Sequence, residues 1–533
     1  MKTRFLLSAF TAAALLSSTA LVTGSASAAT PPNVLVVAQS IDDIVSLDPA
    51  EGYELTSVES FNSLYQRLIE ANATKPTQLD PVLAESWTPS ADGQGVTFAL
   101  RKDAKFASGN PVRPEDVIFS LTRALKLNKS PVFILETLGW TADNVGTFLK
   151  KVDETHVEIS WPAKVGTSFA LSILSAPIAS IVDEKVVDAN VKDNDFGNAY
   201  LHNASAGSGP FKIKAYTPGQ ALVFDANPTS PTGGPKLTSI IFKDVPDAAA
   251  RRLLIQQGDA DIARDLGADQ ISALEGNKDL TVLQAPSAES DYLAFNASNT
   301  DNKALANPAL WEAARWLVDY DGIANGLLKG QYDVHQAFLP KGFPGALNDN
   351  PFKFDLAKAK AALAKGGIAS GTTIKLEVIN QPPFPDIAQA LQASFAKAGI
   401  TLNLVPEVAS DFYGKIRARS DEAALLFWIP DYFDAHSNAS AFALNRDDGT
   451  KTLAWRFGWS IPKISDQTQA AVEAKDPAER AKLYLDIQKQ VQESSPFVLL
   501  LQAKNQIVLR SNVKGFVQGL DADQAYFAGV TKG

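Results

Sequence analysis

The chain has 533 residues, 45% of them hydrophobic and 20% charged, so it is long enough for several domains and too apolar for a disordered chain. Its 59 acidic and 49 basic residues give a formal net charge of −10, which argues against a nucleic-acid-binding protein because such proteins need a basic surface. The absence of cysteine excludes disulfides, a thiol nucleophile and thiolate metal sites, and the four histidines are too scattered for a local metal motif.

The first 28 residues have the pattern of a secretory signal peptide. Lys2 and Arg4 provide a positive N-terminus, an apolar stretch covers residues 5–22, and residues 26–28 (ASA) are typical of a cleavage site. A membrane anchor is the alternative, but serine and threonine dilute the apolar stretch. No later stretch reaches about 18 uninterrupted apolar residues. We therefore expect residues 1–28 to be removed and the mature protein to be soluble in the periplasm.

Short β-branched or aromatic segments bounded by Gly, Pro, Asn or Asp predict strands along the mature chain. In order, they are residues 34–38, 96–100, 157–161, 222–225, 240–243, 292–296, 374–379, 401–405, 424–428 and 507–510. Capping residues indicate the helices. The clearest helix starts after Asp476, where Pro477 and Glu479 complete a capping pattern. Further helices are predicted at residues 355–365 and 386–398 and near 410–419.

Residues 374–428 read as a continuous α/β unit, in which strands and helices alternate with short connections. This pattern implies parallel strands joined by right-handed crossovers, and ligands of such sheets bind beyond the carboxyl ends of the strands. The loop that follows the last strand, residues 429–436 (IPDYFDAH), places two aspartates, two aromatic residues and a histidine at that location. The whole chain is predicted to be mixed α/β with at least two large lobes.

The usual signatures of catalysis are missing from the sequence. It has no GxxxxGK[ST] phosphate loop, no GxGxxG after a strand, no GxSxG elbow and no HExxH motif. Acidic pairs such as Asp259/Asp261 and Asp447/Asp448 would suit glycoside hydrolysis, which leaves an exported hydrolase as an alternative. A large, exported, acidic protein with two lobes and no catalytic signature is more simply explained as a binding protein.

A series of spaced motifs extends over nearly all of the mature chain. The most characteristic run comprises residues 79–87 (LDPVLAESW), 96–101 (VTFALR) and 114–121 (PEDVIFSL). Further segments of the series are residues 207–211, 247–262, 292–296, 354–359, 476–490 and 513–516. In this order the motifs resemble the extracellular solute-binding proteins of family 5, the peptide and nickel class that serves ABC importers.

The resemblance implies an α/β fold, a two-lobed periplasmic-binding-protein clamp of type II, cluster C, with an additional subdomain in lobe I. It implies that lobe I covers residues 29–286, with the extra subdomain at about 71–200, that lobe II covers 287–495, and that residues 496–533 return to lobe I. Such a clamp captures a small-molecule solute between its lobes and delivers it to an ABC importer permease in the inner membrane. No catalytic residue, cofactor or metal is implied, and a monomer that binds no nucleic acid is expected.

The resemblance also indicates where the solute binds. In peptide-binding relatives an aspartate that follows a tryptophan-containing strand pairs with the α-ammonium group of the ligand, and Trp428 and Asp431 match that pattern. A carboxylate in a closed cleft is costly unless it is paired, so Asp431 should select a cationic group. Capping of a turn or pairing within its own lobe is the alternative role for Asp431. A place in the core is the alternative for Trp428, which otherwise offers a flat apolar wall or a cation–π face. The remaining candidates are Tyr432 and His436 at the rim, Tyr53, Glu54 and Thr56 in a first-lobe loop, and His202 and Asn203 before a glycine-rich turn.

Departures from the family pattern leave the identity of the solute open. Phe427 stands where relatives commonly have Gly, and Ala435 stands where Pro is common. A short peptide is favoured, with an oligosaccharide, an opine-like compound or a nickel chelate as alternatives, while the scattered histidines argue against bare metal. Outside the site, Arg123 is interpreted as a surface or structural ion-pair residue, and Trp311 and Trp316 as core residues of a helix.

Overall fold

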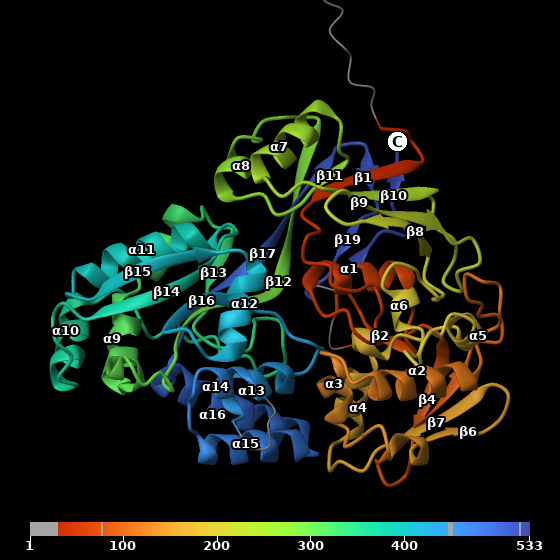
Figure 1. Ribbon diagram of the computed structural model, residues 1–533, viewed down its shortest axis with the longest axis horizontal. Helices are drawn as coiled ribbons and strands as arrows, with labels where there is room; N and C mark the ends of the chain where they lie inside the picture. The colour runs from red at the N-terminus through yellow and green to blue at the C-terminus, as the bar shows by residue number, and fades with distance from the viewer. Residues whose placement is uncertain (1–29, 76–77, 446–450, 522–523) are drawn as a thin grey trace, which may run out of the picture.

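The structure is a computed structural model that describes residues 30–75, 78–445, 451–521 and 524–533, so the predicted signal peptide lies outside the described residues. Figure 1 shows two lobes, one coloured mainly red to yellow, with blue strands near the C-terminus, and the other mainly green to blue. Two long strands, β12 (Leu280–Phe295) and β17 (Phe497–Arg510), connect the lobes and pair antiparallel with each other. The predicted two-lobed α/β fold is confirmed.

One sheet of eleven described strands runs through both lobes. Its order is β15-β14-β16-β12-β17-β11-β1-β10-β9-β8, and β13 (Tyr332–Val334) pairs with β17 beside this path. The first lobe contributes β1 (Val34–Gln39), β8 (Phe211–Thr217), β9 (Ala221–Ala226), β10 (Ser239–Asp244) and β11 (Ile262–Ala263). The second lobe contributes β14 (Thr373–Ile379), β15 (Thr401–Glu407) and β16 (Ala423–Trp428). Strand β14 pairs in parallel with both β15 and β16, as the α/β pattern predicts.

The helices of the second lobe begin where the sequence places capping residues. The carboxylate of Asp355 accepts a hydrogen bond from the amide of Lys358 at 3.0 Å, and that of Asp476 accepts one from the amide of Glu479 at 2.7 Å. These residues start α10 (Leu356–Lys365) and α16 (Pro477–Ser494). The other helices of this lobe are α9 (Pro308–Leu317), α11 (Phe384–Ala396), α12 (Ala409–Ala418), α13 (Ala435–Ala443), α14 (Leu453–Arg456) and α15 (Pro462–Glu473).

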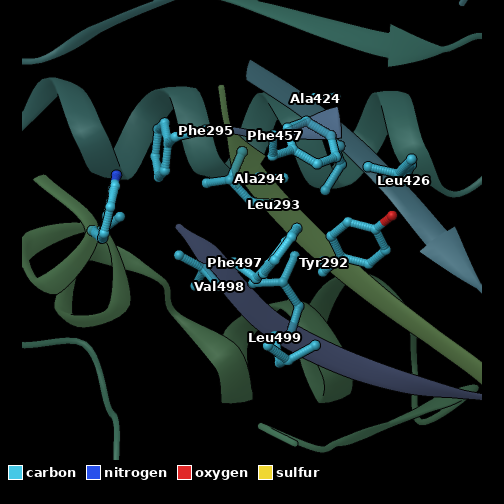
Figure 2. Packing of buried hydrophobic residues seen from close by; sticks show 14 of the residues in the cluster. Tyr292, Leu293, Ala294, Phe295, Ala424, Leu426, Phe457, Phe497, Val498 and Leu499 are labelled. Atoms are coloured by element: carbon cyan, nitrogen blue, oxygen red, sulfur yellow. The ribbon is translucent and has the colours of Figure 1, made fainter. Parts of the chain in front are cut away.

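A dense aromatic and aliphatic core supports the second lobe. Figure 2 shows Tyr292 and Phe295 of β12, Phe457, and Phe497 of β17 within this core. The ring of Tyr292 meets Phe497 edge-on with centroids 5.8 Å apart. Trp311 is buried and donates from Nε1 to the carbonyl of Leu305 at 2.7 Å, so its assignment to the core is confirmed. Trp316 is only partly buried, and the ammonium group of Lys358 lies 4.0 Å from its ring centroid.

The first lobe carries a subdomain with a sheet and a hydrophobic core of its own. The sheet has the order β4 (Ala84–Pro89), β5 (Gly95–Leu100), β7 (His156–Ser160) and β6 (Leu149–Lys151). It is accompanied by α2 (Pro114–Leu127), α3 (Val132–Glu136), α4 (Thr167–Leu174) and α5 (Glu184–Asp188). Its core includes Phe98, Trp140 and Phe169, all nearly inaccessible to solvent. The first lobe thus has an additional sheet with its own core.

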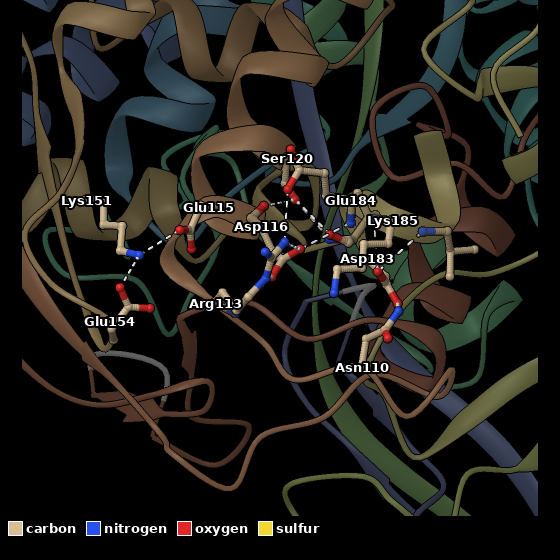
Figure 3. Close-up of polar contacts among 12 residues, drawn as sticks. Asn110, Arg113, Glu115, Asp116, Ser120, Lys151, Glu154, Asp183, Glu184 and Lys185 are labelled. Atoms are coloured by element: carbon tan, nitrogen blue, oxygen red, sulfur yellow. Dashed lines mark hydrogen bonds and ion pairs between the residues drawn. The ribbon is translucent and has the colours of Figure 1, made fainter. Parts of the chain in front are cut away.

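Polar contacts fix α2 to α5, as Figure 3 shows. Asp116 accepts a hydrogen bond from the backbone amide of Arg113 at 2.9 Å, which caps the start of α2. The guanidinium of Arg113 bridges Asp116, at 3.1 Å, and Glu184, at 3.0 Å. Asp183 accepts from the amide of Lys185 at 3.1 Å and so caps α5. The Arg113 bridge therefore joins the start of α2 to the start of α5.

Arg123 is a structural residue of the first lobe. Its guanidinium forms two hydrogen bonds with the Asp48 carboxylate, at 2.8 and 2.5 Å, and a third with the carbonyl of Phe196 at 2.7 Å. Arg123 is 2% exposed and Asp48 is fully buried. The structure thus decides between the two interpretations in favour of a structural ion pair.

Smaller elements complete the described chain. They are α1 (Leu55–Leu64), β2 (Ile69–Ala71), β3 (Leu79–Pro81), α6 (Asn198–Leu201), α7 (Ala248–Gln257), α8 (Ala268–Ser272), β18 (Val513–Lys514), β19 (Val517–Gln518), β20 (Ala525–Tyr526) and β21 (Thr531–Lys532). Within the described ranges, no helix combines the length and the apolar character needed to cross a membrane.

Candidate functional site

Asp431 and Tyr53 meet where the two lobes face each other. Asp431 follows β16 in the second lobe, Tyr53 precedes α1 in the first, and the Tyr53 hydroxyl donates to Asp431 Oδ1 at 2.6 Å. Burial raises the pKa of Asp431 to about 7, although the hydrogen bond from Tyr53 and the positive charge of Arg456 act in the opposite direction. Burial and the nearby Asp431 carboxylate raise the pKa of Tyr53 well above its ordinary value. Two residues predicted for one site from distant parts of the sequence are therefore in contact.

The loop that carries Asp431 is held by its own hydrogen bonds. The amide of Asp431 donates to Ser437 Oγ at 2.8 Å, and Asp434 caps α13 by accepting from the amide of His436 at 2.8 Å. Arg480 of α16 binds both carboxylate oxygens of Asp434, at 2.6 and 2.7 Å. The capping role belongs to Asp434, so the Asp431 carboxylate remains directed toward the first lobe.

Arg456, at the end of α14, places a positive charge near this carboxylate. Its charge lowers the pKa of both Asp431 and Tyr53, and burial lowers its own pKa. Its Nε donates to the carbonyl of Lys451 at 3.0 Å, and it forms no ion pair with any other described residue. The sequence gives no motif for Arg456, since a single arginine on a short helix is normally a surface residue.

Tyr432 and His436 are buried, so the predicted location of both at the rim is wrong. Tyr432 is 4% exposed and meets Phe169 of the first-lobe helix α4 edge-on, with ring centroids 5.9 Å apart. His436 is 5% exposed, lies 5.5 Å from the same phenylalanine ring, and its Nδ1 is 3.2 Å from the hydroxyl of Tyr484. The physical reason is Phe169, which belongs to the core of the first-lobe subdomain and covers both rings. A ligand-binding role for the two residues stays a prediction.

Trp428 lies between the second-lobe core and the interlobe region. It is half-buried, packs edge-on against Phe442 at a centroid distance of 6.3 Å, and pairs with Ser290 across β12 and β16. Its indole Nε1 is buried and has no hydrogen-bond partner within the described part of the chain. Trp428 thus packs against the core, as the alternative interpretation expects, and its indole Nε1 is also available to donate a hydrogen bond.

The other first-lobe candidates divide into two groups. Glu54 is next to Tyr53 and accepts a hydrogen bond from the amide of Tyr53 at 3.2 Å, while the amide of the buried Thr56 donates to Asp43 at 3.0 Å. These residues lie beside the Asp431 contact. His202 instead binds Glu51 through Nε2, and Asn203 is exposed.

The structure does not bring His202 and Asn203 to Asp431. As far as the described residues show, the hydrogen bonds of both stay within the first lobe. Their assignment to the site stays a prediction without a supporting contact.

The lobes are closed on each other around Asp431. The cavity beside this residue has a volume of only about 20 Å³, which is room for about one water molecule. It is lined by Asp431, Tyr432 and Phe433 from the second lobe and by Arg67, Ser175 and Gln524 among residues of the first. A solute in this region requires the lobes to separate.

Two acidic residues of β12, which the motifs do not indicate, also lie between the lobes. Asp291 is fully buried, and burial together with the neighbouring Glu289 carboxylate raises its pKa well above the ordinary value. Burial and the negative charge of Asp265 in the first lobe raise the pKa of Glu289 to about 7. In the sheet, Asp291 is opposite Phe427, directly before Trp428.

Of the acidic residues that suggested hydrolysis, Asp261 has a structural role. Asp261 is buried and accepts hydrogen bonds from the amide of Val36 at 2.8 Å and from the ammonium of Lys532 at 2.9 Å, which ties the C-terminus to β1. Asp447 and Asp448 lie outside the described residues. Among the residues that are described, no group of three or more His, Asp or Glu side chains could hold a metal ion.

Two lobes joined by paired strands and closed over an enclosed carboxylate define a solute-binding protein of the clamp type. The chain belongs to the bacterial extracellular solute-binding proteins, family 5, because the family model described as the middle part of these proteins matches residues 78–450. The family resemblance seen in the sequence is thereby confirmed. Members of this family are binding proteins rather than enzymes.

Individual relatives are similar over almost the whole chain. The probable D,D-dipeptide-binding periplasmic protein DdpA of Escherichia coli (strain K12) is 29% identical, over 92% of this chain and 93% of its own length. The structure of the periplasmic binding protein DppA from Helicobacter pylori, in complex with the peptide STSA, has a TM-score of 0.81 at 22% identity and covers 94% of this chain and 98% of its own. The binding protein MoaA from A. tumefaciens R10, in complex with mannopinic acid, has a TM-score of 0.80 at 22% identity, with 94% and 100% coverage.

Proposed function

We propose that this chain captures a solute with a cationic amine, most simply a short peptide, and delivers it to the permease of an ABC importer. The observation that carries the proposal is the Asp431 carboxylate, which is enclosed between the lobes and has the hydroxyl of Tyr53 as its hydrogen-bond partner. An enclosed carboxylate is stable as an ion only when a positive charge compensates it. A pKa of about 7 means that Arg456 does not compensate it fully, and the ammonium group of a solute would.

A second charge near Asp431 supports a zwitterionic solute. Arg456 has no carboxylate partner among the described residues and is near enough to Asp431 for the two charges to affect each other's pKa. A peptide carries its ammonium and its carboxylate at opposite ends, so Asp431 and Arg456 would bind one end each. A relative named as a D,D-dipeptide-binding protein supports the same class of solute.

Closure around the solute is the second part of the proposal. Tyr432 inserts from the second lobe against Phe169 of the first, so this contact exists only when the lobes are together. The closed form would be the one that the permease recognises, because only this form presents both lobes in a fixed arrangement. We place the lobes at residues 29–286 with 496–533 and at 287–495, and we expect a monomer without catalytic activity.

Export completes the proposal. Residues 1–28 would direct the chain to the periplasm and be removed there, in agreement with a relative that is named as periplasmic. N-terminal sequencing of the secreted protein tests this part, since it should begin at residue 29.

The experiment is native mass spectrometry of the gently purified mature protein, followed by identification of what it releases. Calorimetric titration then compares short peptides with analogues that are N-acetylated or C-amidated. We expect N-acetylation to abolish binding in the wild type, and C-amidation to weaken binding in the wild type but not in Arg456→Met. Asp279→Asn, which removes an exposed carboxylate, is the matched control for Asp431→Asn. Equal affinity for N-acetylated and free-amine peptides would refute the role of Asp431. Release of an opine-like compound would show that the solute is not a peptide but would leave recognition of an amine by Asp431 standing.

A further inference from the structure

Glu289 and Asp291 form a second acidic site between the lobes. The two residues are two positions apart on β12, and their carboxyl groups are close enough to interact. Asp291 is fully buried, no donor group among the described residues meets its carboxylate oxygens, and its side chain interacts only with the Glu289 carboxyl group. Buried polar atoms are almost always paired in native proteins, so an unpaired carboxylate indicates a missing partner.

The protein itself supplies no positive charge to this pair. No ion pair between described residues involves Glu289 or Asp291. The titratable groups that act on the pair or respond to it are Asp265 of the first lobe, Tyr332 of β13 and Tyr413 of α12, and none of them is basic. Asp265 adds a further negative charge instead. When both carboxyl groups are ionised, only a cation from outside the described chain can compensate their charge.

The pair is within reach of a solute bound at Asp431. Asp291 is the cross-strand partner of Phe427, and Asp431 follows Phe427 by four residues. Four extended residues span at most about 14 Å and a cross-strand pair about 5 Å, so the Cα atoms of the two aspartates are within about 19 Å of each other. A short peptide with one long side chain covers such a distance.

We propose that Glu289 and Asp291 form a second cation-binding subsite, which takes an ammonium or guanidinium group of the same solute that Asp431 binds. The inference rests on the proposed function, because it assumes that the solute occupies the interlobe site. It narrows the solute to molecules with two positive groups, such as a short peptide with a lysine or arginine side chain.

The test is calorimetric titration of the mature protein at pH 8 with peptides that differ only in one charge. Alanyl-lysine is compared with alanyl-norleucine, and alanyl-arginine with alanyl-citrulline. We expect the wild type to prefer the charged member of each pair at least about tenfold, since unpaired buried charges are strongly unfavourable. The double variant Glu289→Gln/Asp291→Asn should lose this preference and keep its affinity for the neutral peptides. The exposed pair Glu275→Gln/Asp279→Asn is the matched control and should keep the preference.

A second measurement uses only the wild type, so its result does not depend on whether the variants fold. The preference of the wild type for alanyl-lysine should shrink between pH 8 and pH 5.5, because Glu289 becomes protonated in this interval. Asp431 also titrates near 7 but acts on the α-ammonium group of both peptides, so the affinity ratio isolates the pair.

The outcomes separate the two proposals. Equal affinity for charged and neutral peptides overturns the subsite and leaves the proposed function intact. If no peptide binds, the peptide proposal fails, and the affinities for 1,5-diaminopentane and pentylamine are compared instead. A preference for the diamine that the double variant loses supports the subsite. Equal affinity for the two amines overturns the subsite.

Discussion

Replacing Asp431 with asparagine should stabilise the empty protein and weaken solute binding at the same time. The substitution keeps the shape of the side chain and an oxygen that can accept the hydrogen bond of Tyr53, and it removes only the charge. Opposite effects on stability and binding are specific to a binding residue, because substitution of a residue that only supports the fold would reduce both.

The size of the effect follows from the titration of the carboxyl group. Asp431 titrates near 7 instead of near 4, and each factor of ten in proton affinity corresponds to about 1.4 kcal/mol, so ionisation costs up to about 4 kcal/mol. Asp431 keeps partial contact with solvent, which screens its charge, and we therefore expect about 2 kcal/mol. The free energy of unfolding of the wild type should fall as the pH rises from about 4 to about 7, because the folded form binds the proton more tightly than the unfolded form. The asparagine variant lacks this component.

Differential scanning calorimetry of the empty protein measures the stability effect. At pH 8 the variant should melt about 2 °C higher if the chain unfolds as one unit, and about 4 °C higher if the second lobe unfolds separately. At pH 4 the two proteins should melt at nearly the same temperature. Titration with a free-amine solute should show an affinity loss of about 30-fold or more, the equivalent of about 2 kcal/mol for an unpaired buried charge.

Two results would contradict this reasoning. A variant that melts lower than the wild type at pH 8 would show that the Asp431 charge is already compensated within the protein. Retained affinity for the free-amine solute would show that the ammonium group binds elsewhere. Asp279→Asn is the control for the loss of one negative charge and should leave both quantities unchanged.

Three further variants test other contacts. Tyr53→Phe removes a hydrogen bond that lowers the pKa of Asp431, so the onset of solute binding should move to higher pH in affinities measured between pH 5 and 9. Arg123→Ala leaves a buried carboxylate unpaired and should cost about 3–5 kcal/mol of stability in thermal unfolding, while the folded variant binds solute normally. Tyr432→Ala removes the contact with Phe169 and should release solute about tenfold faster in stopped-flow experiments; an unchanged release rate would show that this contact does not hold the clamp shut.

Much of the fold could be predicted because local patterns and global packing agree. The segment 374–379 is rich in β-branched and aliphatic residues, and it forms β14 between two parallel neighbours. The sequence does not predict the larger, N-terminal parts of β12 and β17, residues 280–291 and 497–506. Residues 280–291 contain Pro286 and several polar side chains, and they form a strand because β17 pairs with them from more than 200 positions away.

In the candidate site, too, some residues could be predicted from the sequence and others could not. The sequence selects Asp431 and Tyr53 separately as binding candidates, and the structure joins the two side chains by a hydrogen bond. Glu289 and Asp291 could not be predicted, because acidic residues in a sequence normally indicate a solvated surface, and their burial results from neighbouring strands. The burial of Tyr432 depends on Phe169, more than 250 positions earlier in the chain.

The ribbon of β12 and β17 has a mechanical consequence for the clamp. Its register shifts between Pro286 and Ser290, so the residues between them are outside the ladder, and the amide of Ala288 donates to the carbonyl of Leu520 at 2.8 Å instead. A bend at this interruption would therefore break no ladder hydrogen bonds, which makes it the expected hinge. Glu289 is within the interruption. A positive charge that binds to Glu289 would act at this hinge directly, so that binding of the solute and closure of the lobes would be coupled.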